Sequence, residues 1–347
     1  MIPKLMKAAV LTAPKTFEIR QVAVPAYGDD EVLIRVTRCS ICGTDIHIYN
    51  GHYSQDKLPL IPGHEFSGEI VAIGRQVSTL TPGQRVVADI NIGCGHCYYC
   101  RRNELLNCPE IRQLGIHTHG AFAQYVAIPA RLVIPIGDEI ADSVACLTEP
   151  FSCVVRASKK IGLSVAESVV VIGAGPVGNM HIQMARLLGA APIIAVELNP
   201  QRAELARQCG ADSVITDPEV ALEQIKALTE GRGADVVIES VGHPELYQQA
   251  LTFMRPGGRL LAFGLTDAQT EIAIKPLEIT LKEQRIQGSV AGMGEDMHQA
   301  LHLLSHQRFI TAPFRESVHP LEDIQQVFST LLAHPQHLKI QLRIAEE

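Results

Sequence analysis

The stretch SVVVIGAGPVGNMHIQMARLLGA (residues 168–190) decides the fold of the central part of this 347-residue chain. A short apolar run leads into three glycines spaced G-x-G-x-x-G, and an apolar-periodic, helix-like segment follows. Gly173 permits a sharp turn, Gly175 lets the backbone approach a pyrophosphate at a helix N-terminus, and Gly178 lets helix and strand pack closely. The stretch therefore predicts a strand, a phosphate-binding turn and a helix that together bind a dinucleotide.

Short apolar runs alternate with helix-like segments on the C-terminal side of this turn. After the first run come PIIAVE (192–197), DSVIT (212–216), ADVVIES (234–240), GRLLAFGL (258–265) and IQGSV (286–290). Such nearly continuous apolar runs fit strands that are buried on both faces of a parallel sheet. We predict a doubly wound α/β domain of the Rossmann type over residues 153–292.

The type of dinucleotide is indicated by Glu197, which ends the run PIIAVE. A carboxylate at this position accepts hydrogen bonds from the adenosine ribose 2′-hydroxyl and repels a 2′-phosphate, so NAD is predicted rather than NADP. Arg202 follows five residues later and is expected to stack on the adenine, with an ordinary solvent-facing helix position as the alternative.

The N-terminal part of the chain differs in composition and in its pattern of apolar residues. Residues 1–150 are rich in Gly and Pro and contain short β-type runs: EVLIRV (31–36), GEIVAIG (68–74), QRVVAD (84–89), AQYVAI (123–128) and RLVIPI (131–136). These runs and the turn signals between them predict a compact, strand-rich domain. HLKIQLRI (337–344) is interpreted as a final strand that rejoins it. The first domain is thus predicted over residues 1–152 and 293–347.

Composition and charge exclude several functional classes. The net charge of −7 and the pI near 6.1 give no reason to expect a nucleic acid or an anionic membrane as a partner. No run approaches the ~20 apolar residues of a membrane span, and the opening MIPKLMKAAVLTAPK lacks a signal-peptide apolar core. We therefore expect a cytoplasmic protein, in which cysteines stay reduced.

Four of the nine cysteines, Cys94, Cys97, Cys100 and Cys108, lie in GCGHCYYCRRNELLNC (93–108). Gaps of two residues let thiolates converge on one tetrahedral ion, and four thiolates without an open position indicate a structural zinc site. A [4Fe–4S] cluster is the alternative, but such runs usually close C-x3-C-P, whereas the last gap here is seven residues.

Further candidate ligands lie in CSICGTDIHIY (39–49), PLIPGHEFSGEI (59–70) and LTEPFSC (147–153). Cys42, His64, Glu65 and Glu149 combine a soft ligand, an imidazole and carboxylates, which suits a zinc ion with an open position. Taken singly, each has an ordinary structural alternative, such as a small core residue, a turn pair or a charge in the first turn of a helix.

The motifs ICGTDIH, PGHEFSG, the four-cysteine lobe, TEPF and VIGAGPVG, in that order, resemble the zinc-containing medium-chain dehydrogenase/reductase family. The resemblance covers essentially the whole chain and is closest to the polyol (sorbitol-type) dehydrogenases and to threonine dehydrogenase. It implies a GroES-like, strand-rich catalytic domain joined to a Rossmann coenzyme domain, with two zinc ions per chain and NAD.

The resemblance also implies roles for individual residues. Cys42 and His64 match the two firmest catalytic zinc ligands, Glu65 matches the third ligand of polyol-type members, and Glu149 falls where alcohol dehydrogenases place a second cysteine. Which glutamate is the direct third ligand stays open.

A second set of residues matches the proton relay and the cofactor site. Thr44 and His47 match the hydroxyl and imidazole that relay the substrate proton outward, and Asp45 resembles a residue that supports the metal site. Zinc then acts as a Lewis acid on the alcohol while hydride passes to the nicotinamide. Further cofactor contacts are expected at Pro176, Val177, Val241, Gly264 and Leu265.

The implied substrate is a secondary alcohol, namely a sugar alcohol or a sugar acid. L-threonine, a sugar-alcohol phosphate, and a non-catalytic NAD-binding role remain as alternatives. Polyol-type relatives commonly form tetramers, so a homotetramer is expected, with a dimer as the alternative. The runs GRLLAFGL (258–265) and IQGSVAG (286–292) are candidates for strands at the edge through which such an assembly forms, with internal strands of the sheet as an equally good alternative.

Overall fold

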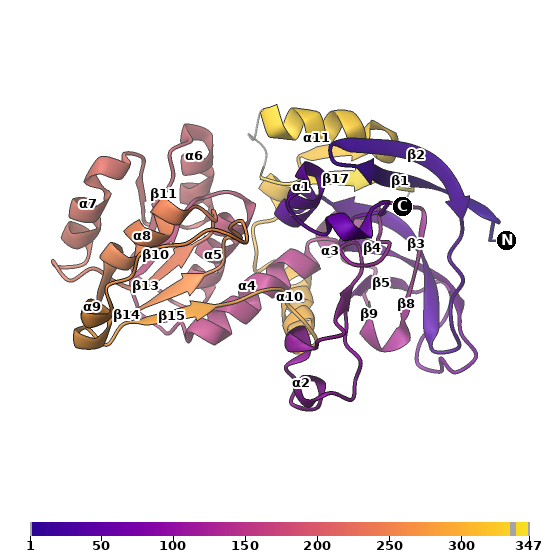
Figure 1. The fold of residues 1–347 in the computed structure, drawn as a ribbon, viewed down its shortest axis with the longest axis horizontal. Helices are drawn as coiled ribbons and strands as arrows, with labels where there is room; N and C mark the ends of the chain where they lie inside the picture. Colours follow the sequence, from indigo (N-terminus) through magenta and orange to yellow (C-terminus); the bar gives the residue numbers. More distant parts are fainter. Residues whose placement is uncertain (1, 334–337, 346–347) are drawn as a thin grey trace. The chain divides into compact units, whose positions relative to one another are not determined.

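The computed structural model describes residues 2–333 and 338–345, which fold into two compact units (Figure 1). The first unit comprises Met1–Ser152, Met293–Gln307 and Thr311–Glu347, and the second comprises Cys153–Gly292 with Arg308–Ile310. Helix α4 (Thr148–Ile161) leads the chain from the first unit into the second. Within the described ranges, no helix combines the length and apolarity that crossing a membrane requires.

The second unit is built on a six-stranded parallel sheet with the order β12-β11-β10-β13-β14-β15. This order is the doubly wound arrangement of dinucleotide-binding domains, in which ligands bind at the carboxyl ends of the strands. Its strands are β10 (Val169–Ile172), β11 (Ile193–Val196), β12 (Ser213–Ile215), β13 (Ala234–Glu239), β14 (Met254–Ala262) and β15 (Arg285–Gly288). Its helices are α5 (Pro176–Leu187), α6 (Pro200–Cys209), α7 (Ala221–Leu228), α8 (Pro244–Phe253) and α9 (Pro276–Leu281).

The predicted apolar runs form this sheet because helices cover both of its faces. All four residues of β10 and all four of β11 are buried. The run 258–265 contributes to β14, which lies between β13 and β15, so for this run the alternative of an internal strand is confirmed and the edge strand is not. The run 286–290 contributes to β15, which is an edge strand of the sheet.

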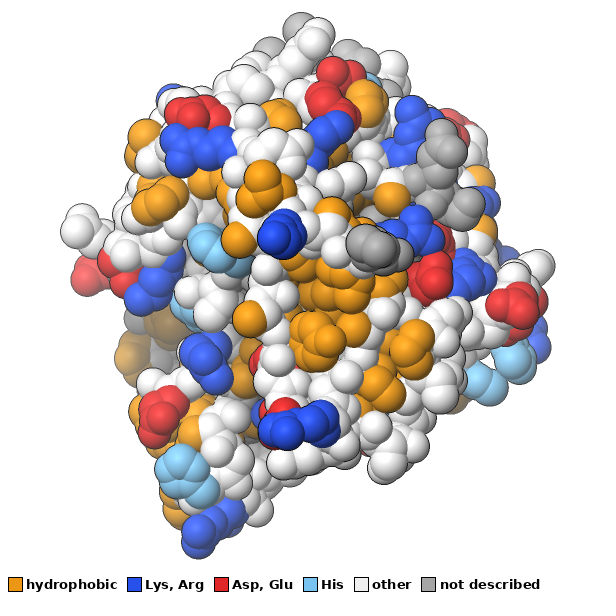
Figure 2. Space-filling view, turned by 90° about the vertical axis from the view of Figure 1, so that its right-hand side faces the viewer, with side chains coloured by type: hydrophobic (Ala, Val, Ile, Leu, Met, Phe, Trp, Pro, Cys, Tyr) orange, Lys and Arg blue, Asp and Glu red, His pale blue; other side chains and the backbone are white. Residues whose placement is uncertain are grey.

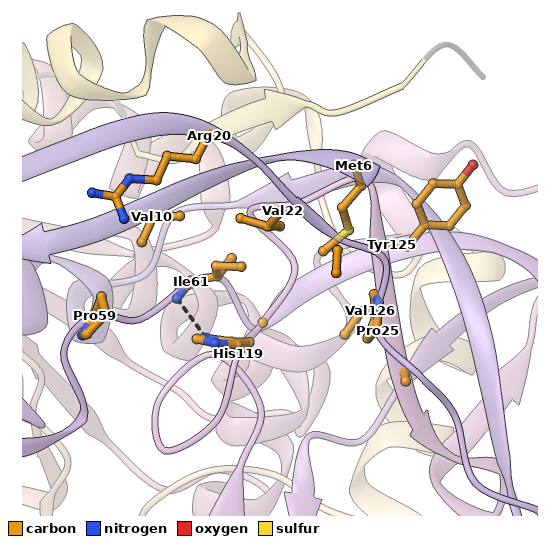
Figure 3. A pocket seen from close by; sticks show the side chains of 13 residues that line it. Met6, Val10, Arg20, Val22, Pro25, Pro59, Ile61, His119, Tyr125 and Val126 are labelled. Atoms are coloured by element: carbon orange, nitrogen blue, oxygen red, sulfur yellow. Dashed lines mark hydrogen bonds between the residues drawn. The ribbon is translucent and has the colours of Figure 1, made fainter. Parts of the chain in front are cut away.

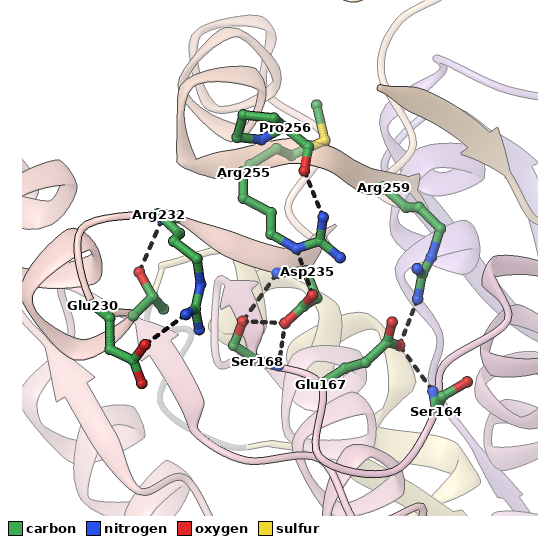
Figure 4. Close-up of polar contacts among 12 residues, drawn as sticks. Ser164, Glu167, Ser168, Glu230, Arg232, Asp235, Arg255, Pro256 and Arg259 are labelled. Carbon is green, nitrogen blue, oxygen red and sulfur yellow. Dashed lines mark hydrogen bonds and ion pairs between the residues drawn. The ribbon is translucent and has the colours of Figure 1, made fainter. Parts of the chain in front are cut away.

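Polar contacts fix the amino ends of the central strands (Figure 4). Asp235, in β13, accepts hydrogen bonds from the backbone N–H and the hydroxyl of Ser168, which precedes β10. The same carboxylate receives Arg255 Nε at 2.6 Å. Burial alone would raise the pKa of Asp235, but the bonds from Ser168 and Arg255 outweigh it and lower that pKa. A single carboxylate thus ties β10, β13 and β14 together.

The first unit contains a seven-stranded sheet with the order β16-β17-β3-β4-β5-β9, and β8 also pairs with β3. The strands are β3 (Glu31–Ser40), β4 (Glu65–Ile73), β5 (Arg85–Ala88), β8 (Tyr125–Pro129), β9 (Val133–Pro135), β16 (Ser317–Pro320) and β17 (Ile340–Arg343). Strand β17 pairs antiparallel with β3, so the C-terminal run rejoins this unit, although its first residue, His337, lies outside the described residues.

Smaller elements complete the first unit. A hairpin of β1 (Leu5–Ala13) and β2 (Thr16–Ala23) and a short pair of β6 (Asn91–Ile92) and β7 (Arg112–Gln113) form separate two-stranded sheets. The helices are α1 (Gly43–Asn50), α2 (Tyr98–Arg101), α3 (Asp142–Ala145), α10 (Glu295–Ser305) and α11 (Ile324–Ala333). The core of this unit includes a contact cluster of the rings of Phe17, Tyr49, Phe122 and Phe328, which joins β2 to α1 and α11.

Candidate active site

Three of the four expected ligands of the catalytic zinc lie together in the first unit. One ligand atom each from Cys42, His64 and Glu65 falls within 4.8 Å of the others. Strand pairing explains the convergence, because Ser40 at the end of β3 faces Glu65 at the start of β4 in the antiparallel register. Cys42 then caps the N-terminus of α1, one short step beyond β3. A thiol, an imidazole and a carboxylate at this separation fit a zinc ion.

Asp45 supports this cluster from the first turn of α1. Its carboxylate accepts the backbone N–H of Cys42 at 2.8 Å and that of Gly63 at 3.3 Å. The same carboxylate lies 3.4 Å from His64 Nδ1, and both side chains are almost fully buried. A carboxylate facing one imidazole nitrogen orients the ring so that its other nitrogen is available to a metal.

Glu65 has two further partners inside the protein. Lys339 Nζ lies 2.6 Å from Glu65 Oε1, and the hydroxyl of Ser40 donates to Oε2. Burial alone would lower the pKa of Lys339, but the Glu65 carboxylate, followed by Cys42 and more weakly Glu149, raises it above its ordinary value. The sequence reasoning missed Lys339, for which the only local signal was a lysine inside the apolar run of the last strand.

Glu149 is placed differently from Glu65. It lies in the first turn of α4 and is almost fully buried. It is not a member of the group in which Cys42, His64 and Glu65 meet, although its charge acts on Lys339. The structure therefore brings Glu65, and not Glu149, into the close cluster.

The two expected relay residues lie on α1, directly after Cys42. The hydroxyl of Thr44 is 3.8 Å from Cys42 Sγ. His47 follows on the next turn of the helix and is half-buried, and its ring centroid lies 6.3 Å from that of His52, which is exposed. Residues three apart on a helix share a face, so Thr44 and His47 lie on one face of α1.

The four lobe cysteines also converge. The sulfur atoms of Cys94, Cys97, Cys100 and Cys108 lie within 4.8 Å of one another, and those of Cys94 and Cys100 are 4.0 Å apart. Thiolates bound to one zinc ion at ~2.3 Å lie about 3.8 Å apart in a tetrahedron. A four-iron cube would hold each thiolate on a different iron and so would need wider spacing. The geometry therefore favours a single ion.

In the second unit, the three glycines adopt the geometry that the motif requires. Gly173 has φ of +85°, and a Cβ there would collide with the side chain of Val241. A Cβ on Gly178 would collide with the carbonyl oxygen of Gly173, so only glycine permits this close approach of helix and strand. At Gly175, by contrast, the nearest atom to an added Cβ is Arg202 Nη1 at 3.8 Å. The open space lies where a pyrophosphate would approach, at the N-terminus of α5, followed by Pro176 and Val177.

Glu197 follows β11 and faces the glycine turn. Its carboxylate accepts the backbone N–H of Ala174 at 2.7 Å and that of Asn199 at 2.8 Å. Each carboxylate oxygen has a second lone pair, so these bonds leave acceptor capacity for a ribose hydroxyl. The bonds hold the negative charge in place beside the phosphate-binding turn.

Glu239, which the sequence reasoning missed, organises the neighbouring turn. It is fully buried at the end of β13 and accepts the backbone N–H groups of Val241 and Gly242. The hydroxyl of Ser240 donates to the carbonyl oxygens of Ile172 and Gly173, which links this turn to the glycine turn. Burial, opposed by these N–H bonds, raises the pKa of Glu239.

The remaining expected cofactor contacts, Val241, Gly264 and Leu265, lie at the same carboxyl edge of the sheet. Val241 and Leu265 are large apolar side chains that are about half exposed, at 52% and 51%. The hydroxyl of Tyr247 donates to the carbonyl oxygen of Gly264 at 2.6 Å. Exposed apolar side chains beside the glycine turn are suited to pack against a flat ring of a bound dinucleotide.

A largely apolar pocket of about 390 Å³ lies elsewhere in the first unit, with Met6, Val22, Pro59 and Ile61 in its lining (Figure 3). The backbone N–H of Ile61 donates to Nδ1 of His119 at 3.2 Å in the same lining. Figure 2 shows hydrophobic side chains gathered on a face of this unit. The residues that line the pocket include no member of the two ligand clusters, so it is separate from the candidate active site.

Comparisons with known proteins identify the family of the chain. Residues 28–138 match the family described as "Alcohol dehydrogenase GroES-like domain", and residues 176–306 match the family described as "Zinc-binding dehydrogenase". The chain is similar to the sorbitol dehydrogenase of Bacillus subtilis (strain 168), with 38% identity over 279 residues, which are 79% of this chain and 78% of the relative. It is also similar to the L-threonine 3-dehydrogenase of Bacillus licheniformis, with 35% identity over 321 residues, which are 91% of this chain and 92% of the relative.

Solved structures give the same result. The alcohol dehydrogenase TADH from Thermus sp. ATN1 has a TM-score of 0.91 at 29% identity, covering 98% of this chain and 100% of that chain. The predicted fold class, the dehydrogenase activity and the use of zinc and NAD are thereby confirmed. The chain belongs to the zinc-binding, medium-chain alcohol dehydrogenase family.

Proposed function

We propose that this enzyme oxidises a secondary alcohol of the polyol type with NAD, and that Cys42, His64 and Glu65 hold its catalytic zinc. The observation that carries the proposal is the convergence of these three donors, from two separate segments, beside the Thr44 hydroxyl. When bound, zinc supplies a Lewis acid that lowers the pKa of the substrate alcohol, and NAD supplies the hydride acceptor.

The protein's own residues handle the released proton. Thr44 Oγ1 is placed to accept the proton of the substrate hydroxyl and to pass on its own, and His47 carries the charge toward solvent. The Asp45 carboxylate, 3.4 Å from Nδ1 of His64, favours a ring orientation in which Nε2 is the nitrogen available to the metal. Lys339 and Ser40 hold the Glu65 carboxylate within the ligand cluster.

Glu65 is our candidate for the direct third ligand, since it lies in the close cluster and Glu149 does not. Both oxygens of Glu65 accept bonds from the protein, yet each retains a lone pair for a metal ion. Glu149 would approach the metal through a water molecule. Glu65→Gln should therefore lower the content of the catalytic zinc more than Glu149→Gln does, which metal analysis of the two variants would compare.

For the substrate, a polyol is favoured by the glutamate at position 149, before Pro150, and by the similarity to a sorbitol dehydrogenase. L-threonine is the second candidate, because a threonine dehydrogenase is similar over a larger part of the chain. The test is the rate of NADH formation with a panel of sugar alcohols, sugar acids, sugar-alcohol phosphates and L-threonine. Turnover of threonine alone would replace the polyol, and absence of turnover with every secondary alcohol would contradict the proposal.

The role of the metal cluster is tested separately with His64→Ala. This variant should lose nearly all turnover. Its affinity for NADH, measured by nucleotide fluorescence, should stay at the native value, because the glycine turn belongs to the second unit. Near-native turnover by the variant would mean that the cluster does not supply the Lewis acid.

Compartment and assembly complete the proposal. We infer a cytoplasmic location, which is supported by the four-thiol lobe, because its cysteines must stay reduced to bind metal. We also infer a homotetramer, with a dimer as the alternative, in which the exposed edge strand β15 contributes to an interface.

A further inference from the structure

Helix α10 carries three histidines that the proposed function does not use. They are His298, His302 and His306, and successive members are four residues apart in the sequence MHQALHLLSH (297–306). Residues four apart on an α-helix lie on the same face, one turn above each other. His306 stands directly after the last helical residue, but its backbone N–H still donates to the carbonyl oxygen of His302 at 3.1 Å. The helical register therefore includes all three positions.

The three histidines form a stripe that faces away from the core. Each of them is exposed, whereas the opposite side of α10 is buried through Met297, Ala300, Leu301 and Leu304. Packing of the helix therefore does not require an imidazole at any of the three positions. A polar glutamine or lysine would serve an exposed helix face equally well.

The rings of His302 and His306 are already adjacent. Their centroids lie 4.2 Å apart, and the ring planes are inclined by 36°. Two imidazoles on successive turns of one helix are a known chelating arrangement for zinc, and imidazole also suits copper and nickel. Because the helix fixes both backbones, little conformational entropy remains to be lost when the pair binds an ion.

We propose that His302 and His306, within this histidine stripe, form a third metal site of the chain, which binds a divalent transition-metal ion. The two imidazoles are its chelating pair. Water completes the coordination because the stripe is exposed. The site shares no residue with the thiolate lobe or with the cluster at Cys42.

The test uses untagged, zinc-loaded enzyme and Ni²⁺ as the probe, because imidazole suits nickel whereas thiolate sites prefer softer ions. Isothermal titration should show one Ni²⁺ bound per chain without release of zinc, and the enzyme should be retained on an immobilised-nickel column. His302→Gln and His306→Gln each remove one member of the chelating pair and should abolish binding in both assays. His298→Gln leaves the pair intact and should bind Ni²⁺ nearly as the native enzyme does.

The matched control is His243→Gln, which removes an exposed histidine at the N-terminus of α8, far from this stripe in the sequence. It should bind Ni²⁺ as the native enzyme does. Native binding by both His302→Gln and His306→Gln would overturn the proposal. So would an equal loss in His243→Gln, since binding would then reflect the total number of surface histidines. Circular dichroism and the zinc content of each variant establish that it is folded.

Discussion

The carboxylate of Glu197 lies beside the phosphate-binding turn and is held there by two backbone N–H groups. A negative charge at this position repels a 2′-phosphate and accepts a ribose hydroxyl, so we expect Glu197 to act on cofactor choice and not on the chemical step.

Glu197→Ser should therefore narrow the preference for NAD over NADP. We expect the ratio of the two kcat/KM values to fall about tenfold or more, which corresponds to roughly 1.4 kcal/mol. Steady-state kinetics with both cofactors measure this ratio. Glu204→Ser, on the exposed face of α6, is the control and should keep the native ratio. Equal use of both cofactors by the native enzyme would refute the assignment.

His47 is the second residue whose role can be tested by itself, because it lies at the outer end of the proposed proton path. Its removal takes away a general base, which typically contributes a factor of roughly 10²–10⁴. His47→Ala should slow alcohol oxidation mainly at low pH, where little solvent base is present to replace it. A pH profile of kcat would show this, and His52→Ala, which removes the exposed neighbouring ring, should change the profile much less. A uniform loss at all pH values would argue against a relay.

At the scale of elements, the cysteine lobe is a short segment whose fold depends on its metal. It is built from the short helices α2 and η2 (Leu105–Asn107) next to the short strands β6 and β7, so we expect bound zinc to supply much of its stability. Cys100→Ser should reduce the zinc content from two ions to one per chain. Elemental analysis measures this, with Cys153→Ser, outside both clusters, as the control. A native content of one zinc, or an iron–sulfur absorption band, would contradict the prediction.

The Asp235 network is a second element-scale feature, because it joins β10, β13 and β14. Its pKa is lowered in the folded protein, so the stabilisation is present above the unfolded pKa near ~3.9 and is lost as the pH falls. Asp235→Asn should lower the free energy of unfolding by about 1–3 kcal/mol at neutral pH. The difference from the native protein should shrink below pH ~4. Urea unfolding at several pH values tests this, with Asp267→Asn, an exposed carboxylate of the same unit, as the control.

Sequence patterns predicted local features better than long-range ones. The glycine turn, each parallel strand and the cysteine lobe are encoded within about twenty residues. Their sequence patterns can therefore be recognised without knowing which residues meet in the folded protein. The ion pair of Lys339 with Glu65 joins residues 274 positions apart, and the lone lysine in an apolar run did not indicate its partner. The same holds for Glu239, whose role depends on burial at the end of β13. Glu149 matches a ligand position of the family. Its distance from the cluster of Cys42, His64 and Glu65, however, depends on how α4 packs, which the sequence does not show.

At the scale of the whole molecule, the second unit exposes several large apolar side chains in and near its edge strand. Ile286 and Val290, in and just after β15, are 43% and 56% exposed, and Leu277 and Leu281 of α9 are 69% and 74% exposed. An edge strand also presents unpaired backbone N–H and C=O groups. A second copy of the chain, related by a twofold axis, could cover both features by pairing β15 with itself.

We therefore expect the native enzyme to be larger in solution than its chain mass of 37.8 kDa, as a tetramer or a dimer. Ile286→Lys places a charge on the edge strand and should shift the assembly toward smaller species, because the buried interface would then contain an unpaired ammonium group. Val165→Lys, at an apolar position of the same unit that is 78% exposed, is the matched control and should keep the native mass. Size-exclusion chromatography with light scattering measures all three proteins. A native monomer would remove the prediction, and an unchanged mass for Ile286→Lys would place the interface on another surface.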